Sequence, residues 1–575
     1  MLSSKVLTCF PCLAVLAGLI SSATALSATA SFRQSSLLSG VEAGTYHYGS
    51  VYCHFYNCTF KPDVLDFEHA TAVAAFNDTL LLQGWGILDV QAGYGLKPTR
   101  QAVTSSFKDG DTVYGAGYAE GILTAHQINN QMTNFFKIWL SGESAVATRK
   151  KLREWLQAQD QWTTQKILEN VGDTFWRHVN YLIQWERGLY EGYKTAAKKD
   201  PSLPARDLFE FRLLQASGSV GDLIKVVDRT QRTDWSSLKA GEILASMFDN
   251  SRCSALIKLL PGFEEIFIGH STWFRYESTA RIFKNYDMNL AGTVNRKISF
   301  SSYGGNLQSL DDFYLVGGNL AMLQTSNNIF NEKLYDLVKP QSLLTWQRVQ
   351  AANWLARGGQ EWTELFSRHN SGTYNNQYMV LDLRLAQTQR PLVKNTLWVA
   401  EEIPGHVESR DLTHVLRSGY FPSYNIPYFE NIFNISGYPA IVEKTGNKAS
   451  YELAPRAKIF RRDQGKVRTL QDMKDLLRYN DYTHEPYSEG NPIFTICARG
   501  DLDSKKPSPF GCYDTKVATV AMARQNRADI IGGPTLGSGL QPFSWTGNFS
   551  KYSHQGLPET YNFSFISVQP RFDHH

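Results

Sequence analysis

A proline–glycine pair divides residues 250–273, NSRCSALIKLLPGFEEIFIGHSTW, into two β-type runs. Pro261-Gly262 is a turn dipeptide, and the flanking runs CSALIKLL and FEEIFIGHSTW are rich in apolar, β-branched and aromatic residues. The pattern predicts a β-hairpin whose first strand starts at a lone cysteine. That hairpin constrains the fold more tightly than any other segment, because it fixes which residues lie side by side.

The register of the hairpin predicts a thiol–imidazole pair. If the loop is centred on the turn dipeptide, Leu260 faces Phe263, and counting outward places Cys253 opposite His270. Directly opposed residues of an antiparallel pair have Cβ atoms about 5 Å apart on one face. An odd loop or a bulge would shift the pairing, and His270 would then be structural or face solvent.

The N-terminus has the pattern of a secretory signal peptide. Lys5 precedes an apolar run over residues 6–20, and residues 23–25 offer an A-x-A cleavage site. No later run stays apolar for the roughly twenty residues that a membrane span needs. We therefore expect a signal peptide at 1–25 and a mature chain, without a transmembrane anchor, that is secreted or lysosomal.

Glycosylation sequons agree with this route, because N-x-S/T acceptors are used in the secretory pathway. They begin at Asn57, Asn77, Asn434, Asn548 and Asn562.

The cysteine count is odd after signal removal. Cys9 and Cys12 leave with the signal peptide. Cys53 with Cys58, and Cys497 with Cys512, are near enough in sequence to close local disulfides, which leaves Cys253 as a candidate free, reactive thiol. The alternative is a buried, inert cysteine, since free cysteines often behave as small hydrophobes.

Length and composition indicate a large globular protein. The chain has 575 residues, is 42% hydrophobic and carries a formal charge of +4. A nearly neutral chain without a long Lys/Arg block disfavours nucleic-acid binding.

Secondary-structure patterns alternate along the chain. Helical spacing is found at 165–199 and 343–368, whereas 229–252 is polar and has the character of an exposed linker. Short β-rich runs follow: KISFSSY, FYLVGGNLAMLQ, YMVLDLRLA and LWVAEEIPG. This order predicts an α+β or layered α/β/β/α domain.

Common catalytic motifs are incomplete. GHSTW at 269–273 lacks the last glycine of a G-x-S-x-G elbow, and His484 lacks the second histidine of a zinc helix. No metal or organic cofactor is predicted. A cysteine at a strand start, after a linker, instead fits self-processing: the thiol attacks the carbonyl of Arg252, and hydrolysis frees the Cys253 α-amine. An α-amine, with a reference pKa near 8, can serve as base beside the thiol.

Four blocks carry a family resemblance. NSGTYNNQYMVLD at 370–382, together with RCSALIK, SYNIPYFENIFN and PRAKIFRRDQ, resembles the phospholipase B-like family. The resemblance implies a secreted or lysosomal glycoprotein with the four-layer αββα sandwich of N-terminal nucleophile hydrolases. It also implies a proenzyme cut before the cysteine, giving a 26–252 fragment with a processing linker (about 229–252) and a 253–575 fragment that stay together as one domain.

The resemblance also assigns site residues. It implies Cys253 as the nucleophile, with His270 and Trp273 lining the site, Asn425 stabilising the oxyanion and Arg456 holding a buried charge. Without the resemblance, Asn425 could be a turn residue and Arg456 a helix cap or a surface ion-pair partner. Asn375 and Asn376 are expected to fix the walls of the site, with direct substrate contact as the alternative.

The predicted function is a carboxylic ester hydrolase that removes acyl chains from glycerophospholipids. Two alternatives stay open: an amidase acting on N-acyl lipids or other linear amides, and a non-catalytic lysosomal lipid-binding glycoprotein. The sequence does not decide the head group, the chain length, the formation of a homo-oligomer, or cleavage by another, trypsin-like protease instead of self-processing.

Overall fold

The computed structural model describes residues 46–95, 105–142, 145–250 and 253–572. The predicted signal peptide, Cys9, Cys12 and Arg252 lie outside these residues. No helix in the described ranges combines the length and the apolar character needed to cross a membrane.

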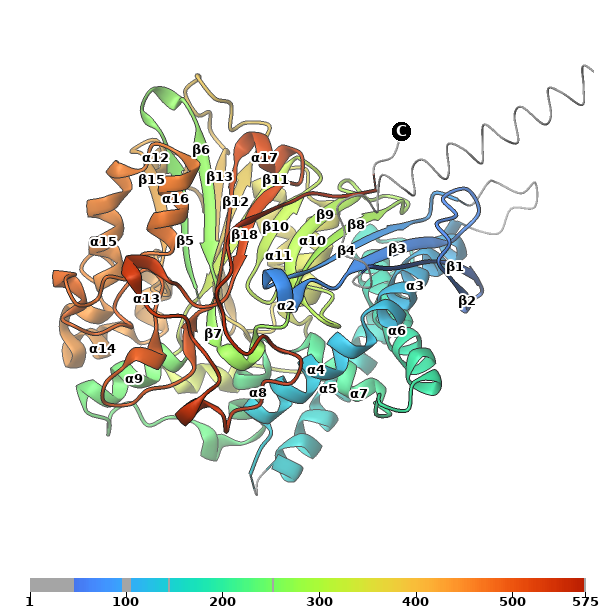
Figure 1. Ribbon diagram of the computed structural model, residues 1–575, viewed down its shortest axis with the longest axis horizontal. Coiled ribbons are helices and arrows are strands. Elements are labelled where there is room, and N and C mark those ends of the chain that lie inside the picture. Colours follow the sequence, from blue (N-terminus) through green and yellow to red (C-terminus); the bar gives the residue numbers. More distant parts are fainter. Residues whose placement is uncertain (1–45, 96–104, 143–144, 251–252, 573–575) are drawn as a thin grey trace, which may run out of the picture.

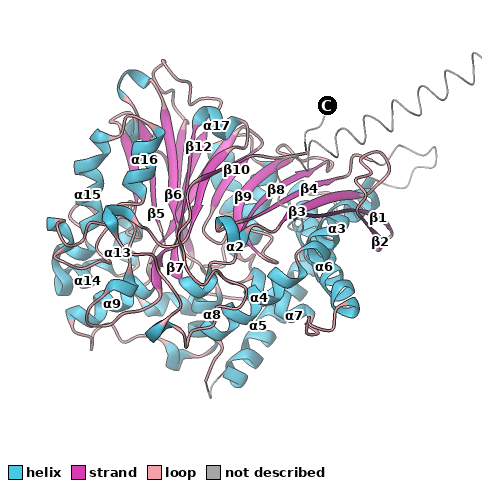
Figure 2. Cartoon of the chain, in the orientation of Figure 1, coloured by secondary structure: helices cyan, strands magenta, loops and turns pink. Residues whose placement is uncertain are grey.

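The larger of two main sheets has eleven strands in the described chain, and β4 pairs in parallel with β8 while the other pairs are antiparallel (Figure 2). In sheet order they are β14 (His406–Asp411), β13 (Leu397–Ile403), β12 (Asn376–Asp382), β11 (Leu320–Ser326), β10 (Phe313–Val316), β9 (Lys297–Tyr303), β8 (Arg281–Met288), β4 (Gly86–Ala92), β3 (Ala72–Asn77), β1 (Tyr46–His54) and β2 (Asn57–Pro62).

The smaller main sheet has six antiparallel strands, and a two-stranded ribbon lies at its end. In order, the six are β15 (Tyr420–Ser423), β5 (Ser254–Leu259), β6 (Ile266–Ser271), β17 (Asp514–Thr519), β18 (Ala528–Gly532) and β19 (Ile566–Val568); the ribbon pairs β16 (Phe510–Cys512) with β7 (Trp273–Arg275).

Helices surround both sheets in the described residues. Before the hairpin they are α2 (Leu80–Gln83), α3 (Ser105–Leu123), α4 (Ala125–Trp139), α5 (Ala145–Glu169), α6 (Thr174–Lys199), α7 (Leu208–Gln215), α8 (Val220–Val227) and α9 (Ala240–Asn250). After it they are α10 (Thr345–Leu355), α11 (Gly359–Phe366), α12 (Thr413–Leu416), α13 (Glu430–Ile435), α14 (Tyr438–Thr445), α15 (Pro455–Asp463), α16 (Leu470–Leu477) and α17 (Val520–Arg524).

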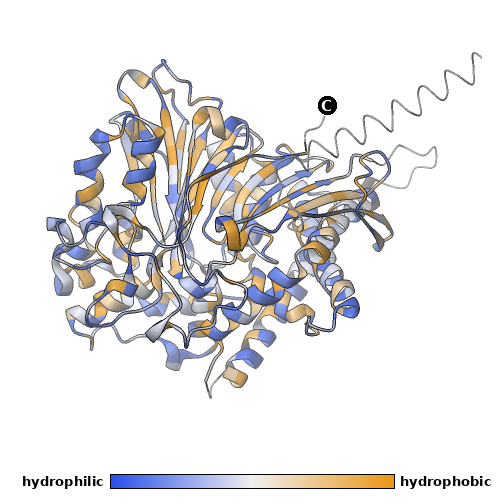
Figure 3. Ribbon diagram, in the orientation of Figure 1, coloured by the Kyte–Doolittle hydropathy of each residue, from blue (hydrophilic) through white to orange (hydrophobic). Residues whose placement is uncertain are grey.

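The two sheets stack face to face between layers of helices (Figure 1). Adjacent residues of β6 show this directly. A Cβ on Gly269 would meet Leu477 of α16, whereas His270, on the other face, bonds the Gln324 carbonyl of β11. On the outer face of the larger sheet, Trp362 of α11 packs on Tyr378 of β12. Apolar residues are concentrated in the central strands, where both faces are covered (Figure 3).

The hairpin forms, but its register differs from the prediction. The Leu260 N–H donates to the Glu265 carbonyl, so the loop takes four residues, 261–264. Gly262 and Phe263 both have positive φ, 68° and 59°, which centres the turn one position later than the dipeptide. His270 therefore pairs with Ala255, and the predicted opposition of Cys253 and His270 is wrong by two residues.

The predicted β-rich runs are confirmed as β9 to β13. Each predicted long helix is two separate helices in the structure. The 165–199 segment breaks before Asp173, which caps α6, and leaves Leu168 and Val171 70% and 75% exposed. The 343–368 segment divides into α10 and α11.

The 229–252 segment is not exposed throughout. It forms a short 3₁₀ turn and then α9, and it buries Trp235, Ile243 and Met247. Its polar residues point outward, but its apolar ones pack into a core shared with β5, β6 and α14 to α16.

Strands from both sides of Cys253 share the larger sheet. β1 to β4 precede it and β8 to β14 follow it, joined through the parallel β4–β8 pair. A cut at the hairpin start would leave this sheet's hydrogen bonds in place.

Candidate functional site around Cys253

Cys253 lies directly before β5, between the ends of two neighbouring strands. It is fully buried and is the free cysteine of the described residues, while Cys53–Cys58 and Cys497–Cys512 form disulfides, as predicted. Ser423 pairs with Ala255, so continuing the β15–β5 register by two places brings Asn425 beside Cys253. Both residues have left-handed backbone, with φ of 89° at Cys253 and 70° at Asn425.

Positive φ is unfavourable for a cysteine. Asn adopts this region several-fold more readily than other non-glycine residues, but Cys does not. Such a conformation costs on the order of 1–3 kcal/mol and persists only where the surroundings enforce it. The strain lies at the residue whose preceding peptide bond is the predicted cleavage point.

Arg456, at the start of α15, ties these residues together. Its Nη1 donates to the Cys253 carbonyl at 2.7 Å and to Ser254 Oγ at 3.1 Å. Its Nη2 donates to the Tyr424 carbonyl and to Asn425 Oδ1, both at 2.7 Å. The guanidinium thus fixes the backbone on both sides of the site.

The charge of Arg456 has no carboxylate partner among the described residues, since all four of its acceptors are carbonyl, hydroxyl or amide oxygens. Burial lowers the pKa of this guanidinium to about 9. An unpaired buried charge is expensive unless a ligand or an anion formed during a reaction compensates it. The site therefore favours negative charge next to Cys253.

Trp273 supplies one wall. Its ring lies 4.3 Å from the Arg456 guanidinium carbon, and its indole N–H is buried without a hydrogen-bond partner among the described residues. The ring packs against the Cys497–Cys512 disulfide, and Cys512 is its cross-strand neighbour.

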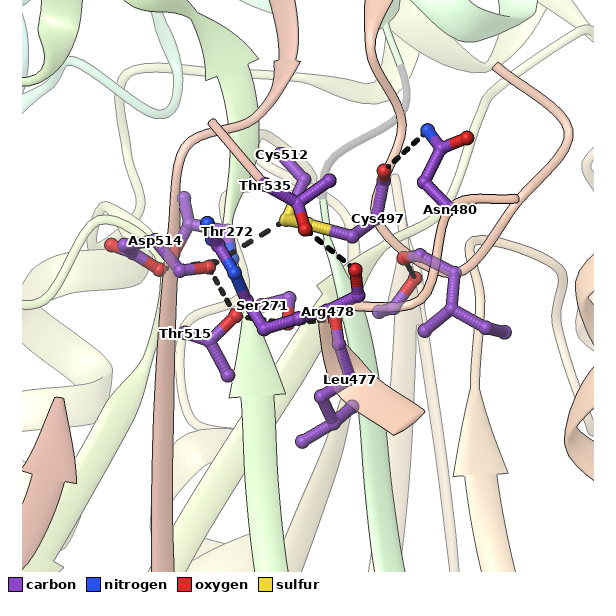
Figure 4. Close-up of a disulfide and its surroundings, with 12 residues drawn as sticks. Ser271, Thr272, Leu477, Arg478, Asn480, Cys497, Cys512, Asp514, Thr515 and Thr535 are labelled. Atoms are coloured by element: carbon purple, nitrogen blue, oxygen red, sulfur yellow. Dashed lines mark hydrogen bonds between the residues drawn. A yellow bond between two sulfur atoms is a disulfide. The ribbon is translucent and has the colours of Figure 1, made fainter. Parts of the chain in front are cut away.

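The surroundings of that disulfide hold the strand ends in register (Figure 4). Ser271 Oγ donates to the Leu477 carbonyl at 2.9 Å, and Asn480 Nδ2 donates to the Cys497 carbonyl at 2.8 Å. The segment before Cys497 also reaches the site, because Ser254 Oγ donates to the Ile496 carbonyl. The disulfide therefore supports the position of Trp273.

A cavity of about 20 Å³ is lined by Asn425 and Arg456, and Met247 and Phe248 of α9 form its other wall. That volume holds roughly one water molecule. In the uncut chain, α9 therefore leaves no room for an acyl chain at these residues.

Burial raises the pKa of the Cys253 thiol to about 12. A hydrogen bond from the Trp273 backbone and the positive charge of Lys516 oppose the shift but do not cancel it. In the uncut chain the sulfur is a thiol, which needs a base before it can act as a nucleophile.

A second set of charges acts on the same thiol. Arg281 binds Asp311 through Nη1 and Nη2 at 2.9–3.0 Å and lies 3.0 Å from Asp514 through Nε. Lys516 Nζ donates to Asp311 at 2.8 Å and to Asp514 at 2.7 Å. We call these four residues the charge cluster; all are buried, and two cations balance two anions.

His270 borders the charge cluster. Its Nε2–H donates to the Gln324 carbonyl at 2.8 Å, and its Nδ1 has no hydrogen-bond partner in the described chain. Burial, reinforced by the positive charge of Lys516, holds the pKa of His270 well below its usual value. The neutral ring thus makes no hydrogen bond to Cys253 in this structure.

His270, Asp311 and Asp514 place possible metal ligands within 4.8 Å of one another. Their chemistry does not fit a metal ion, because Arg281 and Lys516 already bind both carboxylates. An additional cation would be repelled by these two.

Asn375 and Asn376 do not reach Cys253 through any hydrogen bond found here. Asn375 Nδ2 donates to the Gly372 carbonyl, and Asn376 Nδ2 donates to the Tyr374 carbonyl and to Tyr378 Oη. Asn376 thus has local structural bonds, whereas Asn375 also lines a second cavity.

The sequon asparagines differ in exposure. Asn57, Asn434, Asn548 and Asn562 are exposed, whereas Asn77 is 7% exposed in β3. Glycans are sterically compatible with the first four as folded.

Sequence reasoning missed the charge cluster and the two α9 residues. Asp514 and Lys516 alternate along a strand, so the period of two places both on one buried face, and Arg281 begins the fully buried strand β8. Charged residues at alternate positions of a β-type segment were the available signal. Met247 and Phe248 gave none, because contact with the site depends on how α9 docks.

Fold and site together define a two-sheet α/β protein with a buried cysteine centre. A family model described as Phospholipase B matches residues 72–568. A protein of Crotalus adamanteus named Phospholipase B is 44% identical over 528 residues, covering 91% of this chain and 93% of its own. Human Phospholipase B-like 1 is 44% identical over 530 residues, covering 92% of each chain, and Phospholipase B-like protein D of Dictyostelium discoideum is 34% identical over 513 residues, covering 87% of each.

The chain belongs to the phospholipase B family.

Proposed function

We propose that this protein is a phospholipase B-like hydrolase that removes acyl chains from glycerophospholipids through Cys253, made N-terminal by cleavage after Arg252. One observation carries the proposal beyond family membership: a buried guanidinium, without a carboxylate partner among the described residues, bonds both Cys253 and Asn425. The layering of helices around two stacked sheets is consistent with the αββα sandwich of N-terminal nucleophile hydrolases.

Cleavage is proposed to be intramolecular. The Cys253 sulfur attacks the carbonyl carbon of Arg252, the peptide C–N bond breaks, and the Cys253 nitrogen takes up a proton as an amine. Water then hydrolyses the resulting thioester, which releases the Arg252 carboxylate and the free thiol. Strain from the positive φ of Cys253 would be relieved when its peptide bond breaks, which supports this route.

Removal of the linker would open the site. Met247 and Phe248 close the small cavity beside Arg456, so cleavage followed by displacement of α9 would admit a substrate. The shared larger sheet supports continued association of the two fragments.

In turnover, the free α-amine of Cys253 takes the thiol proton, and the thiolate attacks the substrate's carbonyl carbon. Asn425 and backbone N–H groups stabilise the tetrahedral oxyanion, and the charge of Arg456 favours the negative intermediate. The alcohol leaves with the proton from the amine, and water hydrolyses the thioester. Trp273 is proposed to bound the acyl pocket, with His270 and Asn376 supporting its walls.

The route through the cell is part of the proposal. The N-terminal pattern and the exposed sequon residues support a glycosylated protein that is secreted or lysosomal.

The test uses precursor purified with and without serine-protease inhibitors. We expect the larger fragment to begin at Cys253 in both samples, Cys253→Ala to stay uncut, and Cys253→Ser to cut slowly. Sequencing the fragment's N-terminus measures this. A different start, or normal cutting of Cys253→Ala, would refute self-processing and favour a trypsin-like protease.

Activity is measured on cleaved protein at acidic and neutral pH, with a glycerophospholipid and an N-acyl amine in parallel. Fatty acid released from the phospholipid supports the ester hydrolase. Release from the amine alone would make the protein an amidase, and co-purifying lipid without turnover would make it a binding protein.

A further inference from the structure

A second cavity, of about 120 Å³, lies beside the first. Ser326 lines it, and the Ser326 carbonyl accepts the hydrogen bond of Asn425 Nδ2 at 2.7 Å. The same Asn425 lines the small cavity at Arg456, so hydrogen-bonded residues line the two cavities. The second cavity, here called the amide cavity, is therefore a direct neighbour of the proposed reaction site.

The linker closes the amide cavity as well. Trp235 lines it, is 8% exposed, and donates its indole N–H to Glu332 at 3.0 Å. Met247 and Phe248 close the first cavity in the same way. Departure of this segment would uncover both cavities together.

Three residues that line the amide cavity carry buried polar atoms without a partner in the described residues. Asn327 is 7% exposed, and neither its side-chain oxygen nor its nitrogen has a hydrogen-bond partner in the described chain. Asn375 is 3% exposed; its Nδ2 is used by Gly372, and its Oδ1 is unpartnered. Within the described ranges, the indole N–H of Trp139 is also buried without a partner. Buried polar atoms are normally hydrogen-bonded, so these four atoms are free to bond a ligand or water.

The backbone leaves space for this arrangement. A Cβ on Gly221 would come within 2.9 Å of the Trp139 ring, and one on Gly218 within 2.5 Å of Tyr374. Glycine at both places lets two aromatic walls approach.

Charged groups in the wall already have partners. Lys225 donates to Glu332 at 2.8 Å, and Asp222 accepts from Tyr335 Oη and the Tyr374 N–H, both at 2.7 Å. The groups without any partner in the described residues are neutral: donors from Asn327 and Trp139, and acceptors from Asn327 and Asn375.

This mixture selects a class of ligand. A phosphate would place its oxygens against two acceptor oxygens, and a trimethylammonium group can neither donate nor accept a hydrogen bond. A hydroxyl does both. We propose that the amide cavity is a head-group site for hydroxyl-bearing lipids, such as those with inositol or glycerol head groups. Its role as a head-group site rests on the proposed hydrolase function.

Binding tests the ligand class without turnover. Inositol monophosphate, glycerol phosphate and phosphocholine, of which only the last lacks alcohol hydroxyls, are titrated calorimetrically into cleaved protein. We expect the first two to bind at least about tenfold more tightly than the choline compound, because a site with unpaired polar groups discriminates against a ligand that cannot pair them. Binding of inositol alone, or of glycerol alone, would identify the source of the hydroxyls. Equal binding of all three, or tighter binding of choline, overturns the proposal.

Variants test the residues. Asn327→Leu and Asn375→Leu should each weaken inositol monophosphate binding at least about tenfold, and Trp139→Phe, which keeps the ring, should weaken it less. Asn431→Leu makes the same change at an exposed site and should bind as wild type. Should the leucine variants unfold on heating earlier than wild type, Trp139→Phe decides: unchanged binding in it overturns the proposal.

Turnover separates the two proposals. On lysophosphatidylinositol, Asn327→Leu should lower kcat/KM at least about tenfold, with little change on lysophosphatidylcholine. Selective binding without acyl release would refute the hydrolase and keep the ligand class. Acyl release with no head-group preference would refute this inference alone.

Discussion

Two groups of buried positive charge act near Cys253, and they differ in their counterions. In the charge cluster, Arg281 and Lys516 each bind both Asp311 and Asp514. Arg456 has only neutral oxygen acceptors and borders a cavity. Both groups are buried, so burial alone does not distinguish a functional charge from a structural one.

The two groups differ in whether each buried charge already has a counterion. In the charge cluster, two cations and two anions neutralise one another. Removing one residue leaves a buried charge without a counterion. A lone guanidinium is stabilised further when an anion forms beside it. We therefore expect the charge cluster to govern stability and Arg456 to govern turnover.

The largest effect is expected in the charge cluster. Arg281→Met leaves two carboxylates facing one lysine, and breaking a buried ion pair costs about 3–5 kcal/mol. Urea unfolding monitored by fluorescence measures the loss. Arg410→Met, at an exposed pair with Glu408, is the matched control and should cost less than about 1 kcal/mol. Equal losses in both would remove the distinction between cluster and surface.

Arg456→Met should show the opposite balance. Loss of a charge that stabilises an anionic intermediate is expected to raise the barrier by about 3 kcal/mol, which lowers kcat on a phospholipid roughly 100- to 1,000-fold. The free energy of unfolding should fall less than in Arg281→Met, because the groups left unpaired are neutral acceptors and the cost of burying the Arg456 charge is removed. Arg456→Lys keeps the charge and should recover part of the rate. If Arg456→Met instead unfolds as readily as Arg281→Met, the guanidinium is structural.

This contrast marks how far the sequence could predict the site. Cys253 was identified from the odd cysteine count, Asn425 and Arg456 were identified from the family resemblance, and the structure brings the three together. His270 was placed opposite Cys253 by counting from the turn dipeptide. The count failed because the positive φ of Phe263 moved the turn, a choice of loop geometry that residue types do not decide.

The fold shows the same limit. Strands such as β9 and β13 were predictable, because their apolar runs end at turn residues. The break between α5 and α6 was missed, since apolar spacing continues through Val171 although that residue is exposed. The charge cluster combines residues more than 200 positions apart, such as Asp311 and Lys516, so only tertiary structure reveals it.

His270 borders the charge cluster and should have an intermediate effect. Its ring bonds β11 and faces the charge cluster, so His270→Ala should lower turnover about tenfold through the position of β6, with the fold intact. The pH profile is the decisive measurement. Because the pKa of His270 is held far below neutrality, the variant should keep the wild-type profile between pH 5 and 8. A shifted profile would make His270 a proton carrier, and wild-type turnover would make it purely structural.

The smallest expected effect is the response of the charge cluster to acid. Burial alone would raise the pKa of Asp311, but Arg281 and Lys516 hold it well below its usual value. A lowered pKa gives stability that is present above the unfolded value of about 3.9 and is lost only as pH falls through the folded value. The difference in unfolding free energy between wild type and Asp311→Asn should therefore change by less than about 0.5 kcal/mol between pH 7 and 5, and shrink below about pH 4.

Glu186 provides a control of opposite sign for that measurement. Burial raises its pKa to about 7, and Arg212, 3.9 Å away, does not compensate. A raised pKa gives stability that is present below the unfolded value of about 4.3 and is lost as pH rises through the folded value. The free energy of unfolding of Glu186→Gln, relative to that of wild type, should thus rise by on the order of 1–3 kcal/mol from pH 5 to 7. If the difference in unfolding free energy between wild type and Asp311→Asn changed over that same range, the Asp311 carboxylate would be titrating near neutrality. The charge cluster would then not be the balanced set that distinguishes it from Arg456.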